Sequence, residues 1–512
     1  MVLTILVSTA LVMVPVTASL DTSSDTISYV TYFGGSNIEE VSTTACRDDG
    51  VIAMIGHSNS PDLPVSQDAF QQEFCGGEWD AFVTMYDRMG DMILCTYLGG
   101  SEREHVDWVA FDNSGNIVVV GNTASDDFPI TDDALQSERV GEFDGFIAVI
   151  SENGTLLYGT YFGGNSTDSI EFVAIDNNGN YLFGGTTSSA GLATEGAFQT
   201  YPQGGLDAYV AKLSSNGSTM LLFSYYGGST TDRVDSMTVD SSCNFILSGQ
   251  TKSEDFPTSL NAFQEDYAGA GDVFLTKIAS DGSEIQWSTF IGGSSEENGR
   301  GVGVDSADSI IVTGAVTSSD LESYNAFQPE YGGECDTLIA KFTSQGEVQS
   351  LSYLGGNQLD YAYDVEADES DRIVIAGRTL SDNYPLYEQI QSNRTGHLDL
   401  TITIMSNDMD SLVMSTLFGG SKEDSGESVS ISSDGRIVIT GRTASDDLPC
   451  TENAEQDKIG GSYDSFMVII STEDSANIDL SQTVILTAVG VAVVIIAITI
   501  WKRNHLTLRR IE

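Results

Sequence analysis

The chain has 512 residues, of which 52 are glycine and 9 are proline. It carries 75 acidic and 21 basic side chains, and its net charge of −54 at pH 7 argues against nucleic acid or an anionic membrane as the partner of its surface. It contains no Gly-x-Ser-x-Gly, P-loop or His-Glu-x-x-His motif, so the enzyme classes that these motifs mark receive no support.

The first 20 residues are almost wholly apolar or hydroxylic, and Val16-Thr17-Ala18 supplies the small residues of a cleavage point. This pattern predicts a secretory signal peptide over residues 1–20. The basic residues that usually begin such a leader are missing, so an uncleaved anchor and a misassigned start stay open as alternatives.

A Gly-Gly doublet that follows two apolar or aromatic residues recurs seven times after the leader. Successive doublets are 63 to 65 residues apart. The doublets are Gly34-Gly35, Gly99-Gly100, Gly163-Gly164, Gly227-Gly228, Gly292-Gly293, Gly355-Gly356 and Gly419-Gly420. A fixed period indicates a repeat architecture, and a unit of this length holds four short strands.

Each repeat has the same order of segments, as residues 101–162 show. The runs 106–112 and 117–121 flank one Asn/Gly-rich turn, and the runs 145–150 and 156–162 flank another, so two hairpins are expected. Proline is excluded from central strands, and Pro129 therefore marks the long loop between the hairpins. An Ala-Phe-Gln motif follows in several repeats, and we expect its ring to fill the gap between neighbouring units. Four strands per repeat, a to d, suit a propeller blade.

The two ends of the repeat region predict how the ring closes. The region begins with a lone d-type strand at residues 29–33 and ends with a lone c-type strand at residues 466–470. Six complete repeats and these two fragments make seven blades. We therefore predict an all-β fold over residues 27–470, a single seven-bladed β-propeller closed by its N-terminal strand, which removes the open sheet edges.

Residues 484–501 follow a linker at 471–483 and contain no charged side chain. They are long enough to cross a ~30 Å hydrocarbon core as a helix. Lys502, Arg503, Arg509 and Arg510 come next, and positive residues stay on the cytoplasmic side. We predict a C-terminal transmembrane helix, a basic cytoplasmic tail at 502–512 and a single-pass protein of the cell membrane with its propeller outside. A buried core helix is the alternative for residues 484–501.

The repeated motifs resemble those of the seven-bladed β-propeller repeat (SBBP) family of bacterial and archaeal surface proteins. The resemblance covers residues 29–470 and rests on motifs such as Tyr97-Leu-Gly-Gly100, Asp112-Asn-Ser-Gly-Asn116, Gly121-Asn-Thr-Ala-Ser-Asp-Asp-Phe-Pro129 and Asp144-Gly-Phe146. It implies a propeller at a cell surface and no particular reaction. Blades three and five lack the Phe-Pro pair, and blade six has Tyr387-Glu-Gln389 where Ala-Phe-Gln is expected.

Two carboxylate positions recur in every repeat. The fourth residue after each doublet begins the innermost strand, and we expect these residues to ring the channel mouth: Glu39, Glu104, Asp168, Asp232, Glu297, Asp360 and Asp424. Such oxygen ligands suit calcium or another hard cation, and a structural role as acceptors of backbone N–H groups is the alternative. The structural role is expected for the residues before the c strands: Asp80, Asp144, Asp207, Asp272, Asp336, Asp399 and Asp464. The acidic run 364–371 is expected to form a solvated turn at the opposite face.

The remaining candidate residues give weaker indications. Six cysteines lie at dissimilar places in the repeats, so they indicate neither a disulfide framework nor a metal site. Four asparagines begin glycosylation triplets, which suit a surface protein. They are Asn153, Asn165, Asn216 and Asn393. His57, His105 and His397 lie in different repeats, so no enzyme is favoured.

These features predict a membrane-anchored extracellular propeller that acts as a binding or adhesion module. Its ligand would be a glycan, a neighbouring surface protein or cations, with calcium as the one cofactor that the sequence suggests. A structural component of the cell envelope and a hydrolase or lyase of extracellular polysaccharide are the alternatives.

Overall fold

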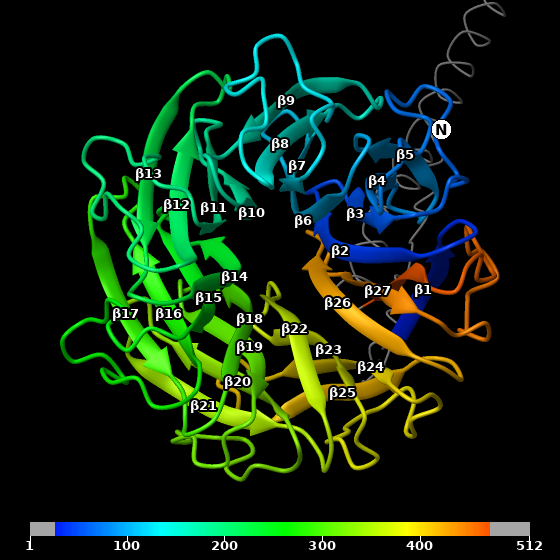
Figure 1. Cartoon of the computed structure of the whole chain (residues 1–512). Coiled ribbons are helices and arrows are strands. Elements are labelled where there is room, and N and C mark those ends of the chain that lie inside the picture. The colour runs from blue at the N-terminus through cyan, green and yellow to red at the C-terminus, as the bar shows by residue number, and fades with distance from the viewer. Residues whose placement is uncertain (1–25, 472–512) are drawn as a thin grey trace, which may run out of the picture.

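The computed structural model describes residues 26–471, and its named elements there are 28 β-strands. The strands form seven four-stranded antiparallel sheets, which surround a central channel as the blades of a propeller (Figure 1). The predicted all-β, seven-bladed architecture is confirmed. The predicted leader, membrane span and basic tail lie outside the described residues. Among residues 26–471, no helix has the length and apolar character that a membrane crossing requires.

The strands of each blade run in the order a to d from the channel outwards. Blades one and two contain β2 (Glu39–Cys46), β3 (Ile52–Ser58), β4 (Asp80–Tyr86), β5 (Met92–Leu98), and β6 (Glu104–Phe111), β7 (Ile117–Thr123), β8 (Asp144–Ile150), β9 (Leu156–Phe162). Blades three and four contain β10 (Asp168–Ile175), β11 (Tyr181–Thr187), β12 (Asp207–Leu213), β13 (Met220–Tyr226), and β14 (Asp232–Val239), β15 (Phe245–Thr251), β16 (Asp272–Ile278), β17 (Ile285–Ile291). Blades five and six contain β18 (Glu297–Val304), β19 (Ile310–Val316), β20 (Asp336–Phe342), β21 (Val348–Leu354), and β22 (Asp360–Ala367), β23 (Ile373–Thr379), β24 (Asp399–Met405), β25 (Leu412–Phe418). Blade seven contains β26 (Asp424–Ile431), β27 (Ile437–Thr443), β28 (Asp464–Ser471) and β1 (Thr26–Phe33).

The turn between strands a and b of each blade lies on the face that we call the bottom. In blade two, Asp112 accepts hydrogen bonds from Ser114 N at 2.8 Å and Asn116 N at 2.9 Å, and Gly115 adopts a φ of 82°. This Asx-type turn reverses the chain between β6 and β7. Strands β7 and β8 are buried along nearly their whole length, because neighbouring blades cover both faces of the sheet.

The hydrophobic core is shared between adjacent blades. One cluster joins Val83 of blade one to Val119 and Phe146 of blade two. The ring of Phe263, from an Ala-Phe-Gln motif in blade four, packs on Phe342 of blade five with ring centroids 6.0 Å apart. The expectation that these rings fill the gap between blades is therefore met, and it explains why the motif recurs with the blade.

The N-terminal strand closes the ring as predicted. Strand β1 pairs with β28 from Thr26 opposite Ser471 to Phe33 opposite Ser465, and Figure 1 shows the blue β1 against the orange strands of blade seven. The Tyr32 hydroxyl donates to Ser445 O at 2.8 Å and accepts from Leu448 N at 3.0 Å. The last blade is thus held by both ends of the repeat region.

A β-bulge in every innermost strand shapes the channel. In each a–b pair the register skips one residue of strand a, three positions after its start. A bulge leaves its extra residue unpaired and re-aims that side chain. The seven bulge residues are Ser42, Asp107, Glu171, Asp235, Arg300, Tyr363 and Glu427.

Candidate functional site: the central channel

The predicted carboxylate ring begins the innermost strands at the top face, which carries the d-to-a and b-to-c loops. Its side chains, however, are enclosed within the blades: Asp168 is fully buried and accepts hydrogen bonds from Gly164 N and Ser189 Oγ, both at 2.7 Å, and from Thr187 Oγ1. The other members are equally buried and accept from the second glycine of their own doublet: Glu39, Glu104, Asp232, Glu297, Asp360 and Asp424. Burial raises the pKa of all seven carboxyls.

These contacts give each ring carboxylate a structural role in its own blade. Among residues 26–471 there is also no group of three or more His, Cys, Asp or Glu side chains that is arranged to hold a metal ion. The cation hypothesis for the ring stays a prediction.

The Gly-Gly doublet is explained by the carboxylates around it. A Cβ on Gly99 would lie 2.7 Å from both Asp80 Cγ and Glu104 Oε2, and a Cβ on Gly100 would lie 2.5 Å from Ser125 Cβ. Only glycine permits such a close approach. The doublet therefore marks the place where two buried carboxylates meet the chain.

The carboxylates before the c strands fix the loop between the two hairpins. Asp144 accepts from Val140 N and Gly141 N at 2.9 Å and from Gln136 Nε2 at 2.8 Å, while Gln136 Oε1 accepts from Gly163 N at 3.1 Å. A glutamine makes the bond to the first glycine of the doublet in all seven blades. Blade six makes it with Gln391, so the sequence comparison that placed Gln389 there was shifted by two residues.

The surface of the channel is made by the bulge residues. All seven line one chamber of about 150 Å³ at mid-height, with Thr43, Trp108, Asp364 and Ser428. Trp108 and Asp364 also line a wider cavity of about 740 Å³ at the bottom mouth, and Asp107 and Glu171 also line a recess of about 330 Å³ at the top. The shared residues join the three cavities into one passage along the axis.

Charge is divided unevenly around the passage. On the side of blades four to seven, Arg233 lies 2.8 Å from Asp235, Arg378 lies over the rings of Tyr361 and Tyr363 at 5.4 and 5.1 Å, and Arg442 bonds to Glu40. On the side of blades two and three, Asp107 and Glu171 have no arginine within ion-pair distance among the described residues. The side of blades four to seven thus holds most of the arginines, and the side of blades two and three holds Asp107 and Glu171 together with His105 and Arg103.

Two histidines that the sequence places in different repeats meet near the top of the channel. The rings of His57 and His105 lie 4.8 Å apart, His57 Nε2 lies 3.2 Å from a Glu40 oxygen, and His105 Nδ1 lies 3.0 Å from Asp107 Oδ1. Burial lowers the pKa of His57, whereas Asp107 raises the pKa of His105. Aligning the repeats would have found this pair, because His57 is the next-to-last residue of a b strand and His105 is the second residue of the a strand of the next blade.

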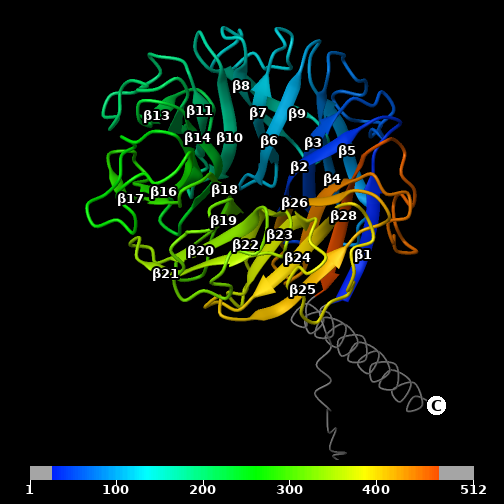
Figure 2. The same cartoon turned by 60° about the horizontal axis from the view of Figure 1, so that its bottom comes forward.

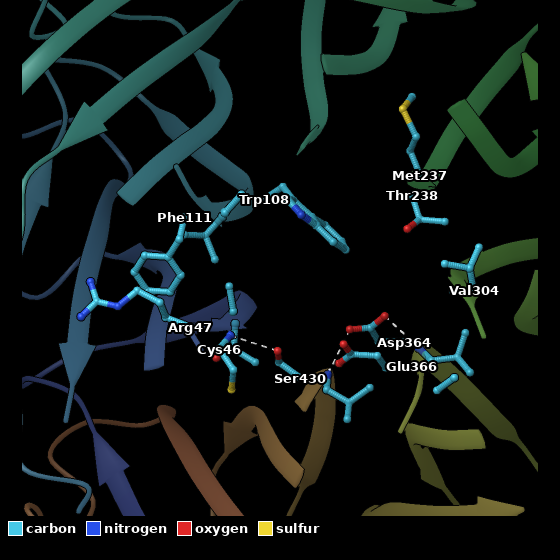
Figure 3. Close-up of a pocket in the computed structure, with 18 of the residues that line it drawn as sticks. Cys46, Arg47, Trp108, Phe111, Met237, Thr238, Val304, Asp364, Glu366 and Ser430 are labelled. Atoms are coloured by element: carbon cyan, nitrogen blue, oxygen red, sulfur yellow. Dashed lines mark hydrogen bonds between the residues drawn. The ribbon is translucent and has the colours of Figure 1, made fainter. Parts of the chain in front are cut away.

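The bottom mouth is lined by Trp108, whose indole ring projects into the hollow opposite Asp364 and Glu366 (Figure 3). Here one expectation was wrong: Asp364 and Glu366 belong to strand β22 and face the cavity, so only the later part of the run 364–371 forms a turn. Burial raises the pKa of Asp364 to about 6 and that of Glu366 to about 8. The alternation of strand β22 explains why these two acids share a face.

The candidate modification sites lie away from the channel. The side chains that begin the glycosylation triplets are all exposed: Asn153, Asn165, Asn216 and Asn393. All six cysteines are free in the structure. Glycosylation itself stays a prediction.

Comparison with known proteins gives one match among curated sequences. Regulatory protein FlaEY of Caulobacter vibrioides is 22% identical over 304 residues, which cover 53% of this chain and 30% of that protein. The chain therefore spans less than a third of the relative that it matches. No protein-family model matches the chain, so the similarity to the SBBP family stays a resemblance.

Two solved structures with low sequence identity to this chain have a similar backbone fold. The Pan2 WD40 domain of Neurospora crassa is 8% identical, with 85% of this chain and 90% of that chain covered and a TM-score of 0.44. BamB from Moraxella catarrhalis is 9% identical, with 88% and 100% covered and a TM-score of 0.38.

Proposed function

We propose that this chain is a membrane-anchored, extracellular binding module whose ligand enters the central channel. The observation that carries the proposal is the state of the mid-channel chamber. Asp107 Oδ2, Asp235 Oδ2 and Arg300 Nε line it, are buried, and have no hydrogen-bond partner among the described residues. Buried polar groups are nearly always paired, so three such atoms around one chamber point to a partner that is not part of the protein.

The size and rigidity of the passage support the same function. The bottom mouth of about 740 Å³ and the top recess of about 330 Å³ have the dimensions of small-molecule sites. Most of their lining side chains come from β-strands of a closed ring, which hold functional groups more firmly than loops do. A closed propeller of this kind suits selective binding through the channel.

The proposed cell-surface location rests on sequence features alone. The uncharged segment 484–501 and the four basic residues after it support an anchor with the propeller outside, and the four exposed glycosylation triplets suit that side of the membrane. A lateral role in the cell envelope and a polysaccharide hydrolase stay as alternatives.

A channel block tests the proposed function. The full chain is screened against glycans, cations and small organic ions, and every hit is measured again with Ser42→Trp, which fills the chamber, and with Ser215→Trp, which adds the same side chain to an exposed turn. We expect Ser42→Trp to abolish binding and Ser215→Trp to leave it unchanged. Hits that survive Ser42→Trp, or self-association as the one activity found, would contradict a channel function.

A further inference from the structure

The mid-channel chamber is strongly acidic. Five carboxylates and a single guanidinium, that of Arg300, line it. Asp364 accepts from Val365 N at 2.8 Å and Val429 N at 3.0 Å, and Glu427 lies 3.8 Å from Arg442 Nε. The other three carboxylates are those of Asp107, Glu171 and Asp235, of which Asp235 also lies 3.9 Å from the Arg300 guanidinium.

These three come from the bulges of blades two, three and four, which are neighbours around the ring. The Asp235 side chain is only 7% exposed; its Oδ1 lies 2.8 Å from Arg233, and its Oδ2 has no hydrogen-bond partner. Asp107 contacts His105 with Oδ1 and likewise leaves Oδ2 unpartnered. Glu171 accepts hydrogen bonds from the hydroxyls of Ser169 and Thr186. The chamber thus presents acceptor oxygens without enough donors.

Glu171 forms no ion pair among the described residues. The titratable groups around it are Asp107 and His105 from β6, Asp235 from β14 and Tyr209 from β12, with Arg300 in the wall of the same chamber. Burial and the two aspartates raise the pKa of Glu171 to about 8, and His105 opposes them. A cation bound beside Glu171 would favour its charged form and would therefore displace a proton from it.

The floor of the chamber favours an organic cation. Trp108 and Asp364 line both the chamber and the wider cavity at the bottom mouth, where Glu366 joins Asp364 and the Trp108 indole projects opposite this pair (Figure 3). An aromatic face attracts ammonium groups and also packs on methylene chains. Metal ligation has no support, because residues 26–471 contain no suitable group of three ligating side chains.

We propose, building on the channel as the binding site, that its ligand is a linear aliphatic polyamine. One protonated amine lies among Asp107, Glu171 and Asp235, the methylene chain crosses Trp108, and a second protonated amine lies beside Asp364 and Glu366. An acidic chamber and an acidic bottom mouth that share the aromatic side chain of Trp108 match alternating charged and apolar groups along one chain. A single inorganic ion would leave one of the two sites empty.

The test measures spermidine binding to the purified full chain by titration calorimetry. Glu171→Gln removes one chamber carboxylate, and Glu195→Gln removes the same charge from an exposed loop of the same blade. We expect at least ten-fold weaker binding for Glu171→Gln and no change for Glu195→Gln. Thermal unfolding of both variants checks that each is folded, and Trp108→Leu serves as a second variant that leaves all carboxylates in place.

Proton linkage supplies an independent readout. In buffers of different ionisation enthalpy near pH 7.5, wild type should release a proton on binding, and Glu171→Gln should release less. Affinity should rise from pH 6 to pH 8 as Glu171, Asp364 and Glu366 lose their protons, and Glu171→Gln should reduce this rise.

Three outcomes would overturn the polyamine assignment. Spermidine binding could be weakened equally by Glu171→Gln and Glu195→Gln, or Mg²⁺ at matched charge could compete with spermidine equally well. Either result would show diffuse attraction to an acidic surface. If spermidine does not bind, and Ser42→Trp abolishes the binding of another ligand, the polyamine assignment is refuted and the channel function stays intact. Spermidine binding that Ser42→Trp does not affect would refute both.

Discussion

Closure of the ring by β1 has a measurable consequence. Deleting residues 26–33 removes four buried apolar side chains, those of Tyr29, Val30, Tyr32 and Phe33. At about 1.5–3 kcal/mol for each buried side chain, the loss is about 6–12 kcal/mol as an upper limit. This loss is comparable to the free energy of unfolding of a typical domain, which is ~5–15 kcal/mol. We therefore expect blade seven to unfold and the ring to open.

The assay combines thermal unfolding with hydrogen exchange. The deletion should lower the melting temperature sharply and remove the exchange protection of β26, β27 and β28. A smaller change, Tyr32→Phe, leaves Leu448 N without its partner and should lower the free energy of unfolding by about 1–3 kcal/mol. Tyr97→Phe removes the equivalent bond to Leu63 N within blade one and serves as the matched variant. Wild-type melting and protection after the deletion would refute closure by β1.

Gly99→Ala should destabilise the protein by about 1–3 kcal/mol in denaturant titration, because the added Cβ would meet two carboxylates. Gly205→Ala, with open space around it, should not destabilise the protein, and equal effects of the two changes would contradict the close-approach explanation. The free energy of unfolding should fall between pH 5 and pH 8.5, because the folded state keeps protons on Asp80 to about pH 7 and on Glu366 to about pH 8, whereas the unfolded chain loses them near pH 4. Glu366→Gln should reduce the slope of unfolding free energy against pH, and an unchanged slope would argue against the buried acid. If the carboxylate ring binds calcium, Ca²⁺ should raise the melting temperature more than NaCl of equal ionic strength does, and the triple variant Asp168→Asn, Asp232→Asn, Asp360→Asn should shrink the difference; equal effects of the two salts would leave the ring with its structural role. Protease added to intact cells should remove the propeller and spare the tail at 502–512, whereas protection of the propeller would contradict the proposed orientation.

The repeat made the architecture accessible from the sequence. The doublets, the prolines and the phase of the two ends sufficed to predict seven blades and their closure, because each feature is fixed by local geometry. Pro129 cannot enter a central strand, and the lone strand at residues 29–33 has one free edge to pair with. Only the boundaries differed, and β1 extends three residues further toward the N-terminus than predicted.

The residues that line the channel could not be predicted from the sequence in the same way. The residues predicted to ring the channel are the first of each innermost strand, and they are buried, whereas the bulge turns the residue three positions later toward the axis. A bulge has no sequence marker here, since the seven bulge residues range from Ser42 to Arg300 and Tyr363. Contacts between blades were missed for a related reason: His57 and His105 are 48 positions apart in the chain, and only the placement of β3 beside β6 brings their rings together.

A crystal structure of the protein with bound spermidine tests the central claim most directly, because it reports the place of binding rather than its strength. The channel account predicts an extended ligand on the axis, with one amine within hydrogen-bond distance of Asp107, Glu171 and Asp235 and its methylene chain against Trp108. A ligand seated on the outer loops, with the mid-channel chamber filled by water alone, would contradict it.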